Sequence, residues 1–290
     1  MPFRSDLAAE AVESAAGQPL SERDVRQKQI RDGDMTVTTI HIDSDRAEQV
    51  LGKPRGTYVT AQFPTLTDHG GAMEDTACRL ATYLEALLPQ TGPVVVAGLG
   101  NERITPDALG PKVASMVLAT RHIRGEFARA AGLSDLRPTA VIAPGVLGQT
   151  GVEAGEIVRG VCSAVHPAAV IAVDALACRD LGRLGRTVQI ADTGIAPGSG
   201  VGNHRAALSA DTLGVPVIAV GVPTVVDAAT IAMELTGQED GDPFPAGHAM
   251  MVTPREIDLL IDRASRLVAM TINRLLQPDY SPLELIALAE

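Results

Sequence analysis

Continuously apolar runs separated by helical patterns make up most of the chain from residue 93 onward. Such runs are typical of strands that are covered on both faces, because a strand with one exposed face alternates apolar and polar residues. The predicted buried strands are 93–99, 139–144, 168–174, 187–192, 215–221 and 248–253. Helical spacing of apolar residues predicts helices at 107–120, 153–165 and 224–235. The alternation predicts an α/β fold, a mostly parallel sheet with helices on both faces.

The N-terminal part has a different pattern. Residues 1–33 are polar and charged, and we expect them to form an arm along the surface. Residues 35–43 and 56–63 are rich in β-branched side chains and predict two paired strands, so 34–66 is interpreted as a β-rich addition to the sheet. Helical spacing of apolar residues follows over 72–88.

The C-terminal part predicts one long amphipathic helix. Thr253-Pro254-Arg255-Glu256 has the form of a capping box with proline at the first helical position. No linker or repeat divides the chain, so residues 1–290 are expected to form a single α/β domain. The apolar stretch 215–233 is interrupted by prolines, a glycine and an aspartate, which favours a buried strand and a helix start over a membrane span.

Composition narrows the classes of function. The 290 residues carry 24 basic and 35 acidic side chains, a formal charge of −11, and only 2% of them are aromatic. Such a chain lacks the basic surface and the stacking platforms of a nucleic-acid binder, so no direct nucleic-acid partner is expected. Three scattered cysteines and an N-terminus without an apolar segment favour a cytoplasmic protein with no disulfides and no membrane contact.

Four loops rich in glycine and proline follow predicted strands, where ligands bind in open parallel sheets. The loops 98–103 and 198–203 lack the third glycine of a dinucleotide-binding motif, and no phosphate-binding lysine motif follows them. Ser199 lies outside a nucleophile elbow. The six histidines are far apart, so neither a metal nor another cofactor is predicted.

Three aspartates at predicted strand ends remain as candidates for catalysis: Asp107, Asp174 and Asp192. Two carboxylates that share a site do not both ionise readily, so one can keep a proton while the other activates water. Asp192-Thr193-Gly194 also occurs in pepsin-type proteases, but those are all-β and supply two copies. Helix capping and turn formation are the structural alternatives for these aspartates.

Four long segments resemble those of germination proteases, the spore endopeptidases of endospore-forming bacteria. They are GLGNERITPDALGP (98–111), APGVLGQTGVEAGE (143–156), IAVDALACR (171–179) and QIADTGIAPGSGVGNHR (189–205). RSDLAAEA (4–11) and GTYVT (56–60) are also similar to family segments. The resemblance covers nearly the whole chain.

This resemblance implies an endopeptidase that degrades small acid-soluble spore proteins during germination, with a fold similar to that of hydrogenase maturation proteases. It implies that Asp107 and Asp174 form the catalytic pair, and that the protein lies in the developing spore and the spore core as a homo-oligomer, a tetramer in the family. Supporting or substrate-binding residues are expected at Asn101, Asp192, Thr193, Gly194, Ser199, Gly200, Asn203 and His204.

The resemblance also implies a zymogen that removes a short N-terminal segment by itself. A short propeptide is expected within residues 1–8, and its processing site within Phe3–Ala8, at Ser5, Asp6 or Leu7. Two alternatives stay open. One is a hydrogenase-maturation-like or metal-dependent peptidase that uses Asp107, Asp174 and His204, and the other is a non-catalytic ligand-binding protein.

Overall fold

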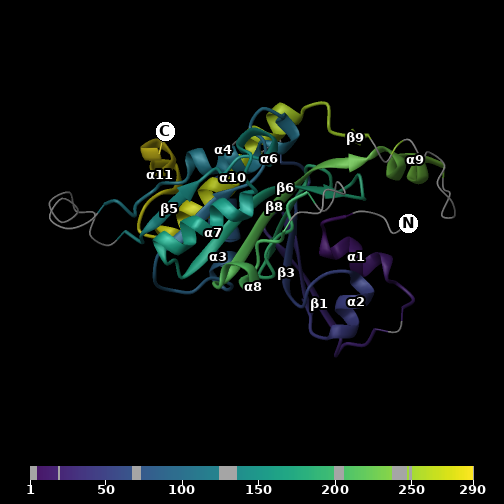
Figure 1. The fold of residues 1–290 in the computed structure, drawn as a ribbon. Helices are drawn as coiled ribbons and strands as arrows, with labels where there is room; N and C mark the ends of the chain where they lie inside the picture. The colour runs from purple at the N-terminus through teal and green to yellow at the C-terminus, as the bar shows by residue number, and fades with distance from the viewer. Residues whose placement is uncertain are drawn as a thin grey trace.

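The computed structural model describes residues 5–18, 20–66, 73–123, 136–198, 206–236, 247 and 250–289. Among them, nine strands form one twisted sheet (Figure 1). Its order is β1-β2-β3-β7-β8-β6-β4-β5, and β9 pairs with β8. The strands are β1 (Val25–Asp32), β2 (Met35–Ile42), β3 (Gly56–Gln62), β4 (Val94–Gly98), β5 (Thr139–Ile142), β6 (Ala169–Cys178), β7 (Thr187–Ala191), β8 (Val217–Asp227) and β9 (Met251–Val252).

The predicted α/β fold is confirmed, and the parallel part of the sheet consists of β5, β4, β6 and β8. The expected strand at 187–192 is present as β7, but it runs antiparallel to both β3 and β8. Only a short turn at 179–186 precedes it, whereas a parallel return needs a crossover of a dozen or more residues. The N-terminal β-rich addition therefore joins the sheet through β7.

Helices cover both faces of the sheet. They are α1 (Ala8–Ser14), α2 (Asp45–Leu51), α3 (Met73–Glu85), the 3₁₀ turn η1 (Thr105–Asp107), α4 (Leu109–Met116), α6 (Leu147–Thr150), α7 (Ala154–Val165), α8 (Ala210–Leu213), α9 (Ala228–Thr236), α10 (Ile257–Leu276) and α11 (Pro282–Ala289). The apolar residues of α3, α4 and α10 pack on one face. On the other face, α7 covers the parallel strands, and α1 and α2 cover the antiparallel ones (Figure 1).

Alternation along the central strands separates these two layers. In β8, Ile218, Val220 and Val222 belong to the core beneath α10, whereas Ala219 and Gly221 face the opposite side. Strand side chains alternate between the two faces, and Ile190 of β7 points to the same face as these β8 residues and belongs to the same core. The small residues of these strands thus face the gap between the α7 layer and the α1–α2 layer.

Several predicted boundaries are wrong. The predicted strand 168–174 continues as β6 to Cys178, so Asp174 lies within the strand and not at its end. The expected helix at 224–235 begins later, because β8 continues to Asp227 and α9 starts at Ala228. The expected capping box at 253–256 does not form, since α10 begins at Ile257 and the Thr253 hydroxyl instead donates to the backbone oxygen of Thr224. The predicted strand 248–253 reduces to Met251–Val252 within the described residues.

Part of the expected surface arm at 1–33 is regular structure. Residues 8–14 form α1, whose Ala8 and Ala9 are buried, and residues 25–32 form β1, which is paired along its length with β2. The polar pattern misled the prediction at β1 because both of its faces are exposed. The predicted strands at 35–43 and 56–63 are confirmed as the antiparallel pair β2 and β3.

Glycines allow α4 to pack closely against the ends of β4 and β6. A Cβ atom at Gly110 would lie 2.2 Å from the carbonyl oxygen of Leu99 and 2.6 Å from that of Val173. A Cβ atom at Gly98 would lie 2.0 Å from the carbonyl oxygen of Gly110. Side chains at these two positions would push the helix away from the strands.

We therefore expect Gly110→Ala to lower the free energy of unfolding by about 1–3 kcal/mol through overpacking. The matched control is Gly160→Ala, since Gly160 is an exposed helical glycine with no atom within 4 Å of an added Cβ. That change should stabilise the protein by about 0.5–1 kcal/mol through helix propensity. Urea unfolding of the two variants measures both effects, and equal stabilities would contradict the close packing at Gly110.

Candidate active site

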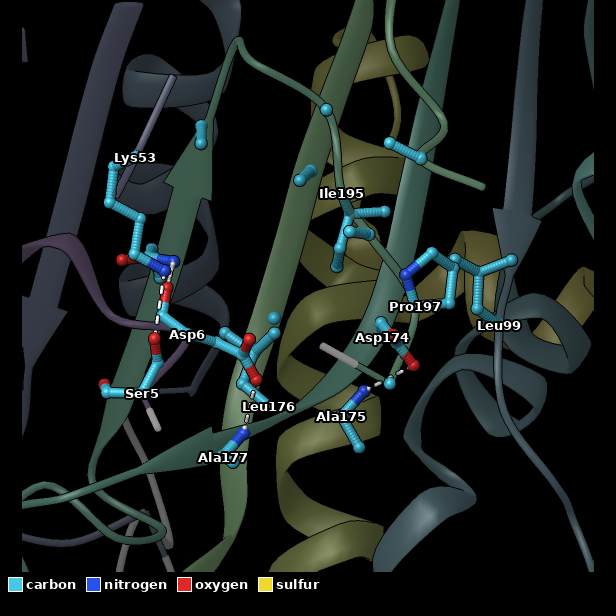
Figure 2. Close-up of a pocket in the computed structure, with 18 of the residues that line it drawn as sticks. Ser5, Asp6, Lys53, Leu99, Asp174, Ala175, Leu176, Ala177, Ile195 and Pro197 are labelled. Atoms are coloured by element: carbon cyan, nitrogen blue, oxygen red, sulfur yellow. Dashed lines mark hydrogen bonds between the residues drawn. The ribbon is translucent and has the colours of Figure 1, made fainter. Parts of the chain in front are cut away.

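A cavity of about 1210 Å³ opens where β4, β6 and β8 lead into their loops (Figure 2). This is the rim at which ligands bind in open parallel sheets, as the sequence predicted. The small residues Ala191, Ala219 and Gly221 line it on the sheet side. Its other walls come from the loop after β4, the end of β6, the segment after β7 and the N-terminal residues.

Asp107 enters the cavity from the loop after β4. It is the last residue of η1, and one of its carboxylate oxygens, Oδ2, accepts the backbone N–H of Asn101 at 2.8 Å. The side chain of Asn101 in turn accepts the N–H groups of Arg103 and Gln149. Gly100 has a φ of +113°, and a Cβ there would lie 2.1 Å from the Asp107 carbonyl oxygen. The predicted supporting residue Asn101 therefore shapes the loop that carries Asp107.

Asp174 enters the same cavity from the middle of the sheet. It is only 5% exposed, and its Oδ1 accepts the N–H of Ala175 at 3.0 Å. The last residue of β4, Gly98, pairs with Val173, so Asp174 is the first residue of β6 beyond the end of β4. The structure thus brings Asp107 and Asp174 to one cavity from adjacent strands.

Thr224 connects the Asp107 loop to β8, and the sequence analysis missed it. Leu176 pairs with Pro223 and Ala177 with Val225, so Thr224 is the extra residue of a β-bulge. Its hydroxyl donates to the carbonyl oxygen of Pro106 at 2.7 Å. Bulges next to functional sites commonly redirect a side chain in this way.

The N-terminal residues predicted as a processing site form one wall of the cavity. Asp6 pairs with Ala177 in both directions: its N–H donates to the Ala177 oxygen at 2.9 Å, and its Oδ2 accepts the Ala177 N–H at 2.8 Å. Leu7 is fully buried beside Leu176. Ser5 offers its carbonyl oxygen to Lys53 Nζ at 3.0 Å. In this arrangement the segment is held against the end of β6.

Two further residues secure that wall. The Gln189 side chain bonds the backbone of the segment twice, accepting from the Ala8 N–H at 2.8 Å and donating to the Asp6 oxygen at 3.0 Å. Burial lowers the pKa of Lys53, while the nearby carboxylates of Asp6 and Glu10 act in the opposite direction. The only sequence signal for Gln189 was a polar residue inside the apolar run 187–192.

Asp192 does not line this cavity in the described structure, whereas its neighbours Thr193 and Gly194 do. Its Oδ1 accepts the backbone N–H of Thr57 at 2.7 Å and so joins the end of β7 to β3. Burial raises the pKa of Tyr58, which also faces the cavity. Four predicted residues lie outside the described part of the chain: Ser199, Gly200, Asn203 and His204.

Within the described residues, no three histidine, cysteine or acidic side chains gather closely enough to hold a metal ion. Nor does any described helix have the length and apolar character needed to cross a bilayer. Four carboxylic residues line the described cavity: Asp6, Glu10, Asp107 and Asp174. Asp6 and Glu10 accept backbone N–H groups of Ala177, Arg179 and Asp180.

Comparisons with known sequences point to one family. Residues 5–236 match the family model described as "Germination protease". The chain is 40% identical to the germination protease of Clostridium perfringens, with 95% of each chain covered. It is 39% identical to that of Caldanaerobacter subterraneus, covering 98% of this chain and 97% of the relative, and 34% identical to that of Bacillus subtilis, covering 96% and 94%. A [NiFe] hydrogenase maturation protease, HycI from Thermococcus kodakarensis, aligns with a TM-score of 0.39 and 22% identity over 67% of this chain and 99% of its own.

The hydrogen bond from Thr224 to Pro106 is expected to stabilise the loop that carries Asp107, and replacing Thr224 by the similarly shaped valine tests this. Thr224→Val removes the donor to Pro106, so the Asn101 amide, which bonds Asp107, should exchange with solvent up to about tenfold faster. Hydrogen exchange followed by mass spectrometry or NMR measures the rate. Thr224→Ser should retain the slow exchange.

Thr271→Val is the matched control for this prediction. It also removes a buried threonine hydroxyl, whose bond to the Leu267 carbonyl lies within α10, far along the chain from the Asp107 loop. Equal exchange at Asn101 in the Thr224→Val and Thr271→Val proteins would show that the Thr224 bond does not hold this loop.

Proposed function

The chain belongs to the germination protease family, and we propose that it is an endopeptidase that cleaves small acid-soluble spore proteins, with Asp107 and Asp174 activating the attacking water. The observation that carries the catalytic assignment is that Asp107 and Asp174 both line one cavity. Asp107 comes from the loop after β4 and Asp174 from within the adjacent strand β6, and each accepts a backbone N–H of its own loop or strand. The developing spore and the spore core are the proposed location.

In this mechanism one carboxylate removes a proton from water while the other, still protonated, hydrogen-bonds the substrate carbonyl. The water oxygen forms the new bond to the carbonyl carbon, and the peptide C–N bond breaks as the leaving nitrogen takes up the proton that the first carboxylate removed from water. The dyad ends with its initial proton count. Both groups lie in a partly enclosed cavity, which strengthens their electrostatic interaction with the reacting atoms.

Backbone N–H groups after β7 are suited to hold the developing oxyanion. Gly194, Ala196 and Gly198 line the cavity. Ile195 is excluded, because its N–H already donates to the Leu208 oxygen at 2.9 Å. Gly194 has a φ of +77°, and a Cβ there would lie 2.0 Å from the Leu208 oxygen, so only glycine allows this turn.

Self-processing at Ser5, Asp6 or Leu7 remains part of the proposal. Because Asp6 is paired with Ala177 and Leu7 is buried, cleavage within this segment requires it to leave the end of β6 first. The homo-oligomeric state, a tetramer, is proposed from the family resemblance alone.

Replacing either aspartate by asparagine tests the dyad. We expect Asp107→Asn and Asp174→Asn each to lower kcat by about 10²- to 10⁴-fold on a small acid-soluble spore protein, with products identified by mass spectrometry. Circular dichroism should show an unchanged fold.

Asp211→Asn, on the exposed first turn of α8, is the control and should retain activity. Full activity of Asp174→Asn would remove the dyad from the mechanism. Loss of activity on chelation, with restoration by a divalent cation, would favour the metal-dependent alternative. Absence of cleavage by a correctly folded and processed wild type would favour a non-catalytic binding protein.

The net charge of −11 predicts an effect of DNA. In the proposed role the substrates coat DNA, and an acidic enzyme is repelled by that surface. Saturating duplex DNA should therefore slow cleavage of the spore protein, as followed by the loss of intact substrate on gels. A peptide substrate that does not bind DNA is the control, and unchanged rates for both substrates would contradict this prediction.

A further inference from the structure

The edge of β6 that faces β4 continues beyond the end of β4. Alternate residues of β6 direct their backbone N–H and C=O groups toward this edge. Val173 accepts the Leu99 N–H there at 2.7 Å, where the chain leaves β4. Four residues later, Ala177 is paired in both directions with Asp6 of the N-terminal segment. The edge is thus covered at Val173 and at Ala177, and Ala175 lies between them.

Ala175 has an uncovered carbonyl group. Its N–H donates to Asp174 Oδ1 at 3.0 Å, but no residue in the described part of the chain donates to its carbonyl oxygen. Ala175 lines the cavity together with Leu99 and Asp6, which flank it (Figure 2). A backbone oxygen at a strand edge is a strong acceptor that needs a partner, and an extended peptide supplies one by adding to the edge.

We propose that the Ala175 carbonyl accepts a main-chain N–H from the substrate and thereby fixes one substrate residue beside Asp174. This inference rests on the proposed endopeptidase function and adds to it a mode of substrate binding. Leu99 and Asp6 cover the edge on either side, so only one substrate residue pairs with β6. The substrate therefore crosses the edge at Ala175 and does not extend the sheet over several residues.

The Ala175 carbonyl, called the anchor below, restricts the class of substrate that can bind. A residue inside a helix has its N–H bonded internally, so a helical segment cannot use the anchor. Proline has no N–H and is excluded at the anchored position. The site therefore takes an extended or locally unfolded segment with a non-proline residue within about two positions of the bond that is cut.

An ester scan of a substrate peptide tests the anchor from the ligand side. The probe is a peptide spanning a cleavage site mapped on a small acid-soluble spore protein, with each amide near that site replaced singly by an ester. An ester keeps the backbone shape but removes the donor. One position within two residues of the cut bond should lose roughly ten- to a hundredfold in kcat/KM, whereas esters further away should have little effect. The cut bond itself is left as an amide.

Isotope labelling tests Ala175 directly. Enzyme carrying Asp107→Asn, to prevent turnover, is labelled with [1-¹³C]alanine and [¹⁵N]leucine, so that HNCO spectra report only Ala–Leu peptide bonds. The sequence has five of these, at Ala86, Ala108, Ala175, Ala207 and Ala287. Ala175→Gly identifies the Ala175 signal by its loss. Neither Ala86 nor Ala287 lines the cavity, and their signals serve as internal controls.

The Ala175 ¹³C carbonyl resonance should move when the all-amide peptide binds, and it should not move with the ester peptide that loses activity. Cleavage combined with an unmoved Ala175 carbonyl and a flat ester scan would overturn the anchor and leave the proposed function standing. A moved carbonyl without any cleavage by the wild type would support the anchor and overturn the proposed function. If the wild type does not cleave the substrate and the Ala175 carbonyl resonance does not move, both the anchor and the proposed function are overturned.

Discussion

Along β6, successive side chains point to opposite faces of the sheet, and this alternation places Asp174 toward the cavity and not into the core. Ile171 and Val173 belong to the core beneath α10, whereas Val170 and Ala172 face α7. Asp174 continues the second series one position beyond the end of β4. A slip of one residue would bury this carboxylate beneath α10. The pairing of β6 with β4 and β8 therefore fixes both the register of the sheet and the position of its candidate chemistry.

The cavity exists because two layers of helices leave part of the sheet uncovered. Described elements pack over the parallel strands on one side of this region and over the antiparallel strands on the other. Between them, small residues such as Ala219 and Gly221 face the open space. Larger residues of the same strands face the α10 layer, so the sheet keeps a full core on one face. Few aromatic residues are needed for this core, because it is made mostly of branched aliphatic side chains.

Much of the fold could be predicted from the sequence, because buried parallel strands and amphipathic helices leave periodic patterns. The predicted helix 153–165 corresponds to α7, which begins after the capping residue Glu153. Predictions failed where tertiary contacts override local signals. Pro223 interrupts the apolar stretch 215–233, and the predicted strand was ended before it, at 221, yet the bulge at Thr224 lets β8 continue past it to Asp227. Asp107 and Asp174 could be placed on one rim by topology, but the contribution of Lys53 and Gln189 depends on contacts with residues far away in the chain.

The carboxylates near the cavity accept backbone N–H groups from very different distances in sequence. Asp6 and Glu10 accept backbone N–H groups from residues about 170 positions away, and Asp192 accepts one from 135 positions away. Those bonds join separate elements, and removal of the acceptor would leave a backbone N–H of another element without this partner. In contrast, Asp107 accepts an N–H six residues away and Asp174 accepts that of the next residue. Each of these local bonds orients a carboxyl group on its own element, and both residues line the cavity in which the proposed acid–base chemistry would take place.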